Sequence, residues 1–234
     1  KQSDIHQKSL YFSHHLRIFK PNPELKFSKI YIIHMNPFFK GAFALCMTLL
    51  TLFVDAQIQS PEQYLGYKVG TSFTRHHKIV EYFKYVAKAN PSMVKLMPYG
   101  KTNEGRDLLV AAISSAENIA QLDNIRKHNI GLTEGTVEDT KQPAIVWLSY
   151  NVHGNEASST EVAMKLLYEL VSGKNDTLAN YLKNVVVIID PCLNPDGRDR
   201  YVNWFNQTIG AHPNANPNAR EHAEPWPGGR TNHY

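Results

Sequence analysis

The chain has 234 residues, of which 42% are hydrophobic and 20% are charged, and its formal net charge is +4. These values are typical of a globular protein with one or two domains. The excess positive charge lies in residues 1–34, whereas the chain from residue 57 onward has 18 basic and 18 acidic residues. A globular part without net charge gives no reason to expect a nucleic-acid partner.

Residues 35–56 have the pattern of a secretory signal peptide. Lys40 precedes the 14-residue apolar run "GAFALCMTLLTLFV", and the small residues Val54 and Ala56 precede a cleavage position at Gln57. The run is short for a membrane span, and its order of basic residue, apolar core and small residues is that of an export signal. The alternative interpretation is a helix buried in the core.

The signal-peptide interpretation divides the chain into three parts. Residues 1–34 are then an upstream extension that is not native, residues 35–56 are the signal peptide, and residues 57–234 are the globular part. We therefore expect a secreted or periplasmic protein without a stable membrane span. Removal of Cys46 with the signal peptide would leave Cys192 alone, so no disulfide framework is expected.

The globular part begins with alternating helices and strands. Apolar residues at helical spacing predict a helix over 73–89, which Asn90 and Pro91 end. Residues 92–100 and 106–115 read as two strands joined by the turn "KTNEG". We expect a short helix over 117–128 and a loop over 129–143.

Two apolar runs, residues 144–150 and 184–190, flank the clearest helix. Each run is continuous, as in a strand buried on both faces. Residues 158–171 form an amphipathic helix with Glu161 on its polar face and with Ser158 and Glu161 as a capping box. The order strand, helix, strand predicts a parallel pair in an α/β sheet, and the chain after Phe205 reads as loop.

Polar segments follow both apolar strands. "NVHGNE" ends the first and "PCLNPDGRDR" ends the second, so both lie at the sheet edge where α/β proteins place their sites. His153 and Glu156 suit zinc, and Gly154 between them gives the backbone freedom to bring both side chains to one point. The alternative is that Glu156 favours the positive helix end and that His153 is a solvated loop residue.

These segments resemble the zinc carboxypeptidase family of metallopeptidases. The resemblance is carried by "YNVHGNEASSTEVAMKLLYEL" and "VVIIDPCLNPDGRDR", and "YGKTNEGRDLLVAAISS" is similar to the hairpin that opens the catalytic domain. It spans residues 64–234, and within the family the chain looks like the secreted members from Bacteroidetes-type bacteria. It implies an α/β fold with a mixed, mainly parallel sheet and helices on both faces, truncated here at its C-terminal side.

The resemblance also implies roles for single residues. His153 and Glu156 match the first two zinc ligands, and Arg230 in "GGRTN" matches the arginine that steadies the carbonyl oxygen. Arg220 is the alternative for that arginine, and Arg230 would then be an ordinary loop residue. The third ligand, the general-base Glu and the Asn–Arg pair for the substrate carboxylate are expected beyond Tyr234. His222 and His233 lie in the wrong segment to replace the third ligand.

The function implied is that of a secreted zinc metallocarboxypeptidase, of which this chain is an N-terminal fragment, inactive by itself. One zinc ion per catalytic domain would activate a water molecule, and the substrates would be the C-termini of peptides or proteins. Two alternatives remain. One is a zinc-dependent amino-acid deacylase of the same fold, and the other is a non-catalytic binding domain that has kept the fold.

Overall fold

The computed structural model describes residues 57–138 and 142–225. The predicted upstream extension (1–34), the predicted signal peptide (35–56) and Arg230 lie outside these residues. Within the described ranges, no helix combines the length and apolar character needed to cross a membrane.

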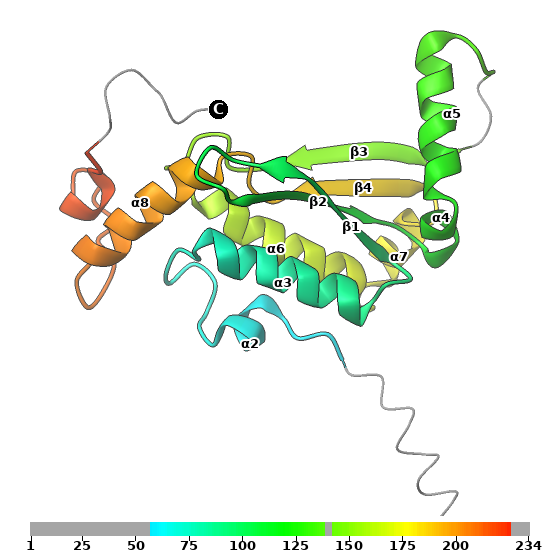
Figure 1. The fold of residues 1–234 in the computed structure, drawn as a ribbon. Coiled ribbons are helices and arrows are strands. Elements are labelled where there is room, and N and C mark those ends of the chain that lie inside the picture. The colour runs from blue at the N-terminus through cyan, green and yellow to red at the C-terminus, as the bar shows by residue number, and fades with distance from the viewer. Residues whose placement is uncertain (1–56, 139–141, 226–234) are drawn as a thin grey trace, which may run out of the picture. The chain divides into compact units, whose positions relative to one another are not determined.

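The described residues form helices and strands in mixed order (Figure 1). In chain order they are α2 (Pro61–Leu65), α3 (His76–Ala89), β1 (Val94–Lys101), β2 (Asp107–Ile113), α4 (Ala116–Ala120), α5 (Leu122–Glu134), β3 (Ala144–Ser149), α6 (Ser158–Val171), α7 (Asp176–Tyr181), β4 (Val185–Asp190), α8 (Pro195–Thr208) and the 3₁₀ helix η2 (Arg220–His222).

The strands form one mixed sheet in the order β1-β2-β4-β3. β3 and β4 are parallel in a register that runs from Ala144 opposite Val185 to Ser149 opposite Asp190, which confirms the predicted parallel pair. β1 and β2 form the predicted antiparallel hairpin, and β2 is also antiparallel to β4. The mixed α/β fold is confirmed, but parallel pairing does not predominate in these four strands, because a short turn allows β1 and β2 only an antiparallel arrangement.

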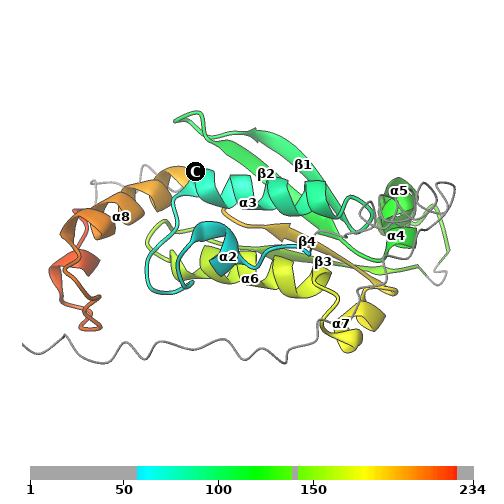
Figure 2. The same cartoon turned by 90° about the horizontal axis from the view of Figure 1, so that it is seen from below.

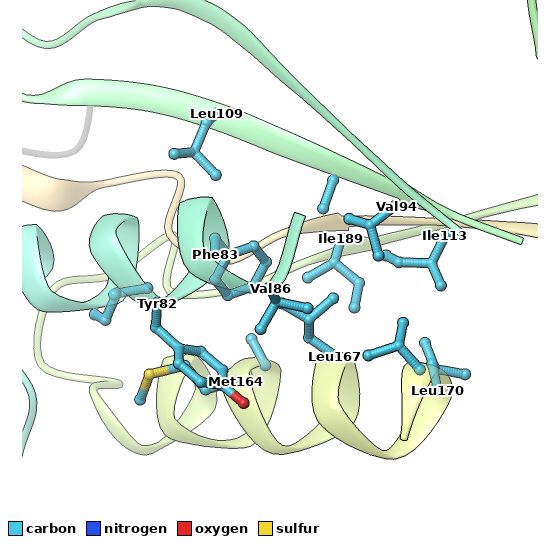
Figure 3. Packing of buried hydrophobic residues seen from close by; sticks show 14 of the residues in the cluster. Tyr82, Phe83, Val86, Val94, Leu109, Ile113, Met164, Leu167, Leu170 and Ile189 are labelled. Atoms are coloured by element: carbon cyan, nitrogen blue, oxygen red, sulfur yellow. The ribbon is translucent and has the colours of Figure 1, made fainter. Parts of the chain in front are cut away.

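The main core lies between the sheet and the helices α3 and α6, which run side by side under one face (Figures 1 and 2). Phe83 and Val86 of α3 and Leu167 of α6 are fully buried, and Figure 3 shows them facing Ile113 and Ile189 of the sheet. These positions follow the helical and strand periodicities predicted from the sequence.

The opposite face of the sheet is covered by a smaller cluster. Ile125 of α5 packs there against Ala112 and Val186, the strand residues that alternate with those of the main core. Helices therefore cover both faces, as predicted. The single helix expected over 117–128 is in fact α4 followed by α5, and α5 continues to Gly135, whose left-handed backbone ends it (φ 67°).

Three further expectations are wrong. The strand expected to be buried on both faces, β3, is an edge strand, with Val146 and Trp147 exposed. The capping box is absent, because α6 has Ala157 as its N-cap residue and Glu161 is buried. The chain after Phe205 is not only loop, because α8 continues to Thr208 and η2 follows at Arg220–His222.

Candidate active site

Two loops meet at the carboxyl ends of β3 and β4, as the sequence predicted. The backbone N–H of Tyr150 donates to the carbonyl of Asp190 at 3.0 Å, and that of Leu193 donates to the carbonyl of Tyr150 at 2.9 Å. The N–H of Asn194 then donates to the carbonyl of Asn151 at 3.2 Å. Residues 151–157, hereafter the ligand loop, are thus joined to the segment that starts α8.

The ligand loop brings the two predicted zinc ligands together. His153 Nδ1 lies 3.1 Å from Glu156 Oε1, and the backbone N–H of Glu156 donates to the carbonyl of His153 at 3.0 Å. Their side chains are 48% and 58% exposed, so both are accessible from solvent.

An imidazole nitrogen and a carboxylate oxygen at this separation fit two positions of a zinc site. No cluster of three or more His, Cys, Asp or Glu side chains suited to a metal occurs among residues 57–138 and 142–225. The described part therefore offers two ligands, and their assignment stays a prediction.

The backbone freedom that the ligand loop needs comes from Asn151, not from Gly154. Asn151 has a left-handed backbone (φ 58°), which Asn tolerates better than most residues. Its amide Nδ2 donates to the carbonyls of His153 at 2.6 Å and Gly154 at 3.3 Å. Gly154 is required for another reason: a Cβ there would lie 2.1 Å from the backbone of Gly197 in α8.

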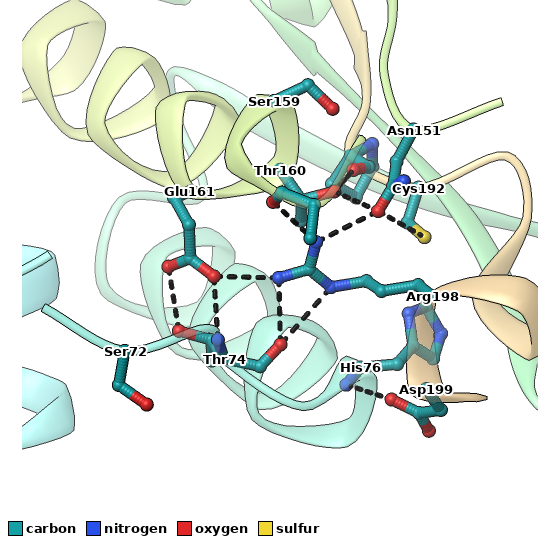
Figure 4. Close-up of polar contacts among 12 residues, drawn as sticks. Ser72, Thr74, His76, Asn151, Ser159, Thr160, Glu161, Cys192, Arg198 and Asp199 are labelled. Carbon is teal, nitrogen blue, oxygen red and sulfur yellow. Dashed lines mark hydrogen bonds and ion pairs between the residues drawn. The ribbon is translucent and has the colours of Figure 1, made fainter. Parts of the chain in front are cut away.

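A buried guanidinium lies beneath the ligand loop (Figure 4). Arg198 of α8 is 0% exposed, and its Nη1 donates to Asn151 Oδ1 at 2.9 Å and to the carbonyl of Ala157 at 2.6 Å. Its Nη2 donates to Glu161 Oε1 at 2.7 Å, while Nε and Nη2 both donate to the carbonyl of Thr74. The five donated bonds match the five N–H groups of an arginine, which is what a buried charge requires.

The predicted alternatives for other roles lie elsewhere. Arg220, in η2, is exposed with its guanidinium 6.0 Å from the ring centre of Trp204. His222 contacts the carbonyl of Asn214 through Nε2 at 2.7 Å and the hydroxyl of Tyr201 through Nδ1 at 3.5 Å. Both ring nitrogens of His222 are thus used in contacts that join η2 to its neighbours.

Comparison with known proteins decides the family. Residues 79–233 match the family model for zinc carboxypeptidases. The chain belongs to the zinc carboxypeptidase family. The resemblance found in the sequence is thereby confirmed.

Individual relatives are distant, and the chain matches only part of each. A zinc carboxypeptidase from Saccharothrix mutabilis subsp. capreolus is 22% identical over 147 residues, which are 62% of this chain and 29% of that protein. The thrombin activatable fibrinolysis inhibitor structure has a TM-score of 0.44 at 18% identity and covers 61% of this chain and 29% of its own. Carboxypeptidase A from Helicoverpa armigera has a TM-score of 0.42 at 20% identity, covering 68% and 32%.

This zinc carboxypeptidase homologue also buries a carboxyl group beside its ligand loop. Asp190, the last residue of β4, accepts a hydrogen bond from the hydroxyl of Tyr99 at 2.6 Å and one from the backbone N–H of Cys192 at 3.2 Å. Burial raises the pKa of Asp190 above its ordinary value, although both hydrogen bonds favour the ionised form. Burial also raises the pKa of the Cys192 thiol to about 12. Asp190 was not singled out from the sequence, and Cys192 was named only as an unpaired cysteine.

A second ionic cluster joins the β1–β2 turn to α8. Arg106 pairs with Asp196 at 2.6 Å, with Asp199 at 2.8 Å and with Glu104. Thr102 donates to Asp196 at 2.7 Å. Burial opposes the ionisation of Asp196, but the hydrogen bonds from Thr102 and Arg106 outweigh it and hold the pKa of this carboxyl below its ordinary value. The acidic residue of "NPDG" therefore has a structural role.

Proposed function

We propose that the natural protein is a secreted zinc metallocarboxypeptidase, which removes C-terminal residues from peptides, and that this chain supplies its first two zinc ligands. The observation that carries the proposal is the contact of 3.1 Å between His153 Nδ1 and Glu156 Oε1 at the ends of a parallel strand pair. Family membership supports the choice of zinc. The order of basic, apolar and small residues over 35–56 supports secretion.

The ligand residues have defined tasks in this proposal. His153 would offer the lone pair of a neutral Nδ1, and Glu156 would offer a carboxylate oxygen, so neither atom keeps a proton when the metal is bound. A bound zinc ion supplies Lewis acidity, which polarises a carbonyl and lowers the pKa of a water molecule.

Arg230 would donate to the carbonyl oxygen of the scissile bond as negative charge develops there. Loss of one such donor typically costs roughly 10²–10³-fold in rate. The third ligand, the general base that takes the proton from water, and the pair that holds the substrate carboxylate are expected beyond Tyr234.

The test uses the protein extended through its natural reading frame. His153→Ala removes a ligand, and Glu156→Gln replaces a carboxylate with a poorer one, so zinc content and hydrolysis of an N-blocked dipeptide should fall together. Arg230→Ala should keep its zinc, because arginine has no lone pair to offer, and should lower kcat by roughly 10²-fold or more with a smaller change in KM. Elemental analysis and steady-state kinetics measure both.

His222→Ala is the matched control, because the polar contacts of His222 are with Asn214 and Tyr201 and its ring lies near that of Phe205. It should keep both zinc and activity. Full zinc and full activity in His153→Ala would refute the metallopeptidase proposal. Full kcat in Arg230→Ala would transfer that role to Arg220, and hydrolysis of N-acyl amino acids instead of peptides would favour the deacylase.

A further inference from the structure

We propose that Arg198 is a positioning residue, which fixes the shape of the ligand loop and thereby the direction in which His153 and Glu156 point. The inference rests on the proposed function, because it concerns residues assigned there as zinc ligands. It adds a role for α8, whose first turn contacts the ligand loop through Gly197 and Arg198.

The first step is that one nitrogen atom joins the two ends of the loop. Arg198 Nη1 donates to the side chain of Asn151, where the loop begins, and to the carbonyl of Ala157, where it ends. Both distances, 2.9 and 2.6 Å, are short enough for hydrogen bonds. Because both acceptors bind the same planar group, the separation of the loop ends is set by the guanidinium.

The second step carries this constraint to the ligand itself. Asn151 uses its Oδ1 to accept from Arg198 and its Nδ2 to donate to the carbonyl of His153 at 2.6 Å. The hydroxyl of Thr160 lies 3.0 Å from the same Oδ1. Arg198 and Thr160 therefore fix the side-chain amide of Asn151, and this amide in turn fixes the backbone of His153. The same contacts support the left-handed backbone of Asn151.

The third step is that the loop rests on the first turn of α8. Gly154 and Gly197 are in backbone contact too close for any Cβ, and the N–H of Asn194 donates to the carbonyl of Asn151. Arg198 is the next residue of the same turn, so all these contacts come from one rigid element. Metal sites need such support, because their ligands function only in a narrow range of orientations.

The fourth step concerns the choice of arginine. The three remaining N–H bonds of the guanidinium go to Glu161 and to the carbonyl of Thr74, and Thr74 also donates to both carboxylate oxygens of Glu161. Buried ion pairs are weak sources of stability, since apolar residues of similar volume often serve as well. Apolar residues or a lysine cannot hold two acceptors at a fixed separation and also pair with a carboxylate, as the guanidinium of Arg198 does.

The experiment uses the protein extended through its natural reading frame and two variants. Arg198→Lys keeps the charge opposite Glu161 but loses the planar group, and Asn151→Gly keeps the left-handed backbone but loses the amide. Zinc dissociation constants are measured by competition with a chelator. Hydrogen exchange of the metal-free proteins is measured on peptides that cover residues 151–157.

We expect each variant to bind zinc roughly 10- to 100-fold more weakly, the usual effect of removing a group that orients a metal ligand. Exchange should become faster in residues 151–157 and stay unchanged in β1 and β2. Since Arg198 acts partly through Asn151, the double variant should bind zinc more tightly than the product of the two single effects predicts. Arg106→Lys is the control, because it weakens another ionic cluster on α8 through Glu104, Asp196 and Asp199. Arg106→Lys should leave the zinc dissociation constant unchanged.

If Arg198 has a purely structural role, Arg198→Lys should have a lower melting temperature, a zinc dissociation constant within about twofold of the parent value and unaltered hydrogen exchange in the loop. This result would overturn the proposal. Fully multiplicative effects in the double variant would also overturn it. If Arg198→Lys does not fold, Asn151→Gly decides alone by the same two readouts. Failure of the parent protein to bind zinc would instead refute the proposed function, and loop exchange would still test the positioning role.

Discussion

The two edges of the sheet differ in chemistry. β1, at one edge, contains Lys95, Pro98 and Lys101 and is irregular between Pro98 and Gly100. β3, at the other edge, reads "AIVWLS" and has neither a charge nor a proline, although Val146 is 42% and Trp147 59% exposed. Charges, proline and bulges are the devices by which proteins prevent an edge from pairing with another strand.

The difference indicates that only the β1 edge has features that prevent pairing with another strand. β1 is protected against further pairing, whereas β3 has the continuous apolar sequence of a strand from the middle of a parallel sheet. The prediction that β3 is buried on both faces is therefore wrong for the described residues, and its sequence still indicates a neighbour. We expect β3 to pair with a further strand in the natural protein.

The largest expected effect tests whether β3 is covered. In the protein extended through its natural reading frame, Trp147→Ala should lower the free energy of unfolding by about 3–5 kcal/mol, the usual cost of truncating a buried aromatic residue. Phe83→Ala, in the core beneath β1 and β2, is the reference and should cost a similar amount. Urea unfolding measures both. A cost below ~0.5 kcal/mol for Trp147→Ala would show that β3 is a true outer edge.

A smaller effect is expected when residues 57–234 are produced alone. Their uncovered β3 should cause self-association, and Trp147→Lys should raise the concentration at which it occurs by about tenfold, or ~1.4 kcal/mol. Ile130→Lys is the control, since Ile130 is an exposed apolar residue on helix α5. Sedimentation velocity distinguishes the two. An equal effect from Ile130→Lys would mean that general apolar surface, and not the edge, drives association.

The smallest effect concerns the ionic cluster that joins the protected side of the sheet to α8. Because the pKa of Asp196 is depressed in the folded state, its ionised form contributes stability that is present above the unfolded-state pKa and is lost as the pH falls through the folded-state value. Asp196→Asn should therefore cost about 1 kcal/mol at pH 7 and progressively less below pH ~4. Urea unfolding at several pH values measures this, and a cost independent of pH would contradict it.

Local patterns were sufficient for most of the fold. Helical periodicity located α3 and α6, the apolar runs located β3 and β4, and the strand–helix–strand order predicted their parallel pairing. The same order predicted that the two polar loops meet, because the carboxyl ends of parallel strands lie at one edge.

Two of the errors arise because the partner of a residue is distant in sequence. Glu161 lies at helical spacing from the polar residues of α6, so nothing local indicates that it is buried; its partner Arg198 comes 37 residues later. The position of β3 at an edge likewise depends on which strands surround it. The start of α8 did have a local signal, since Asn194 followed by Pro195 is a favourable helix N-terminus.

The buried thiol of Cys192 can report local unfolding of this protein. Its thiol is 2% exposed, lies 3.7 Å from Asn151 Oδ1 and has a pKa of about 12, so in the folded state it is closed to alkylating reagents and almost never a thiolate near neutral pH. A maleimide would react only with molecules in which the segment between β4 and α8 has opened. In a chain that starts at residue 57, Cys192 is the sole cysteine. Its labelling rate would thus measure how often the segment that packs against the ligand loop opens.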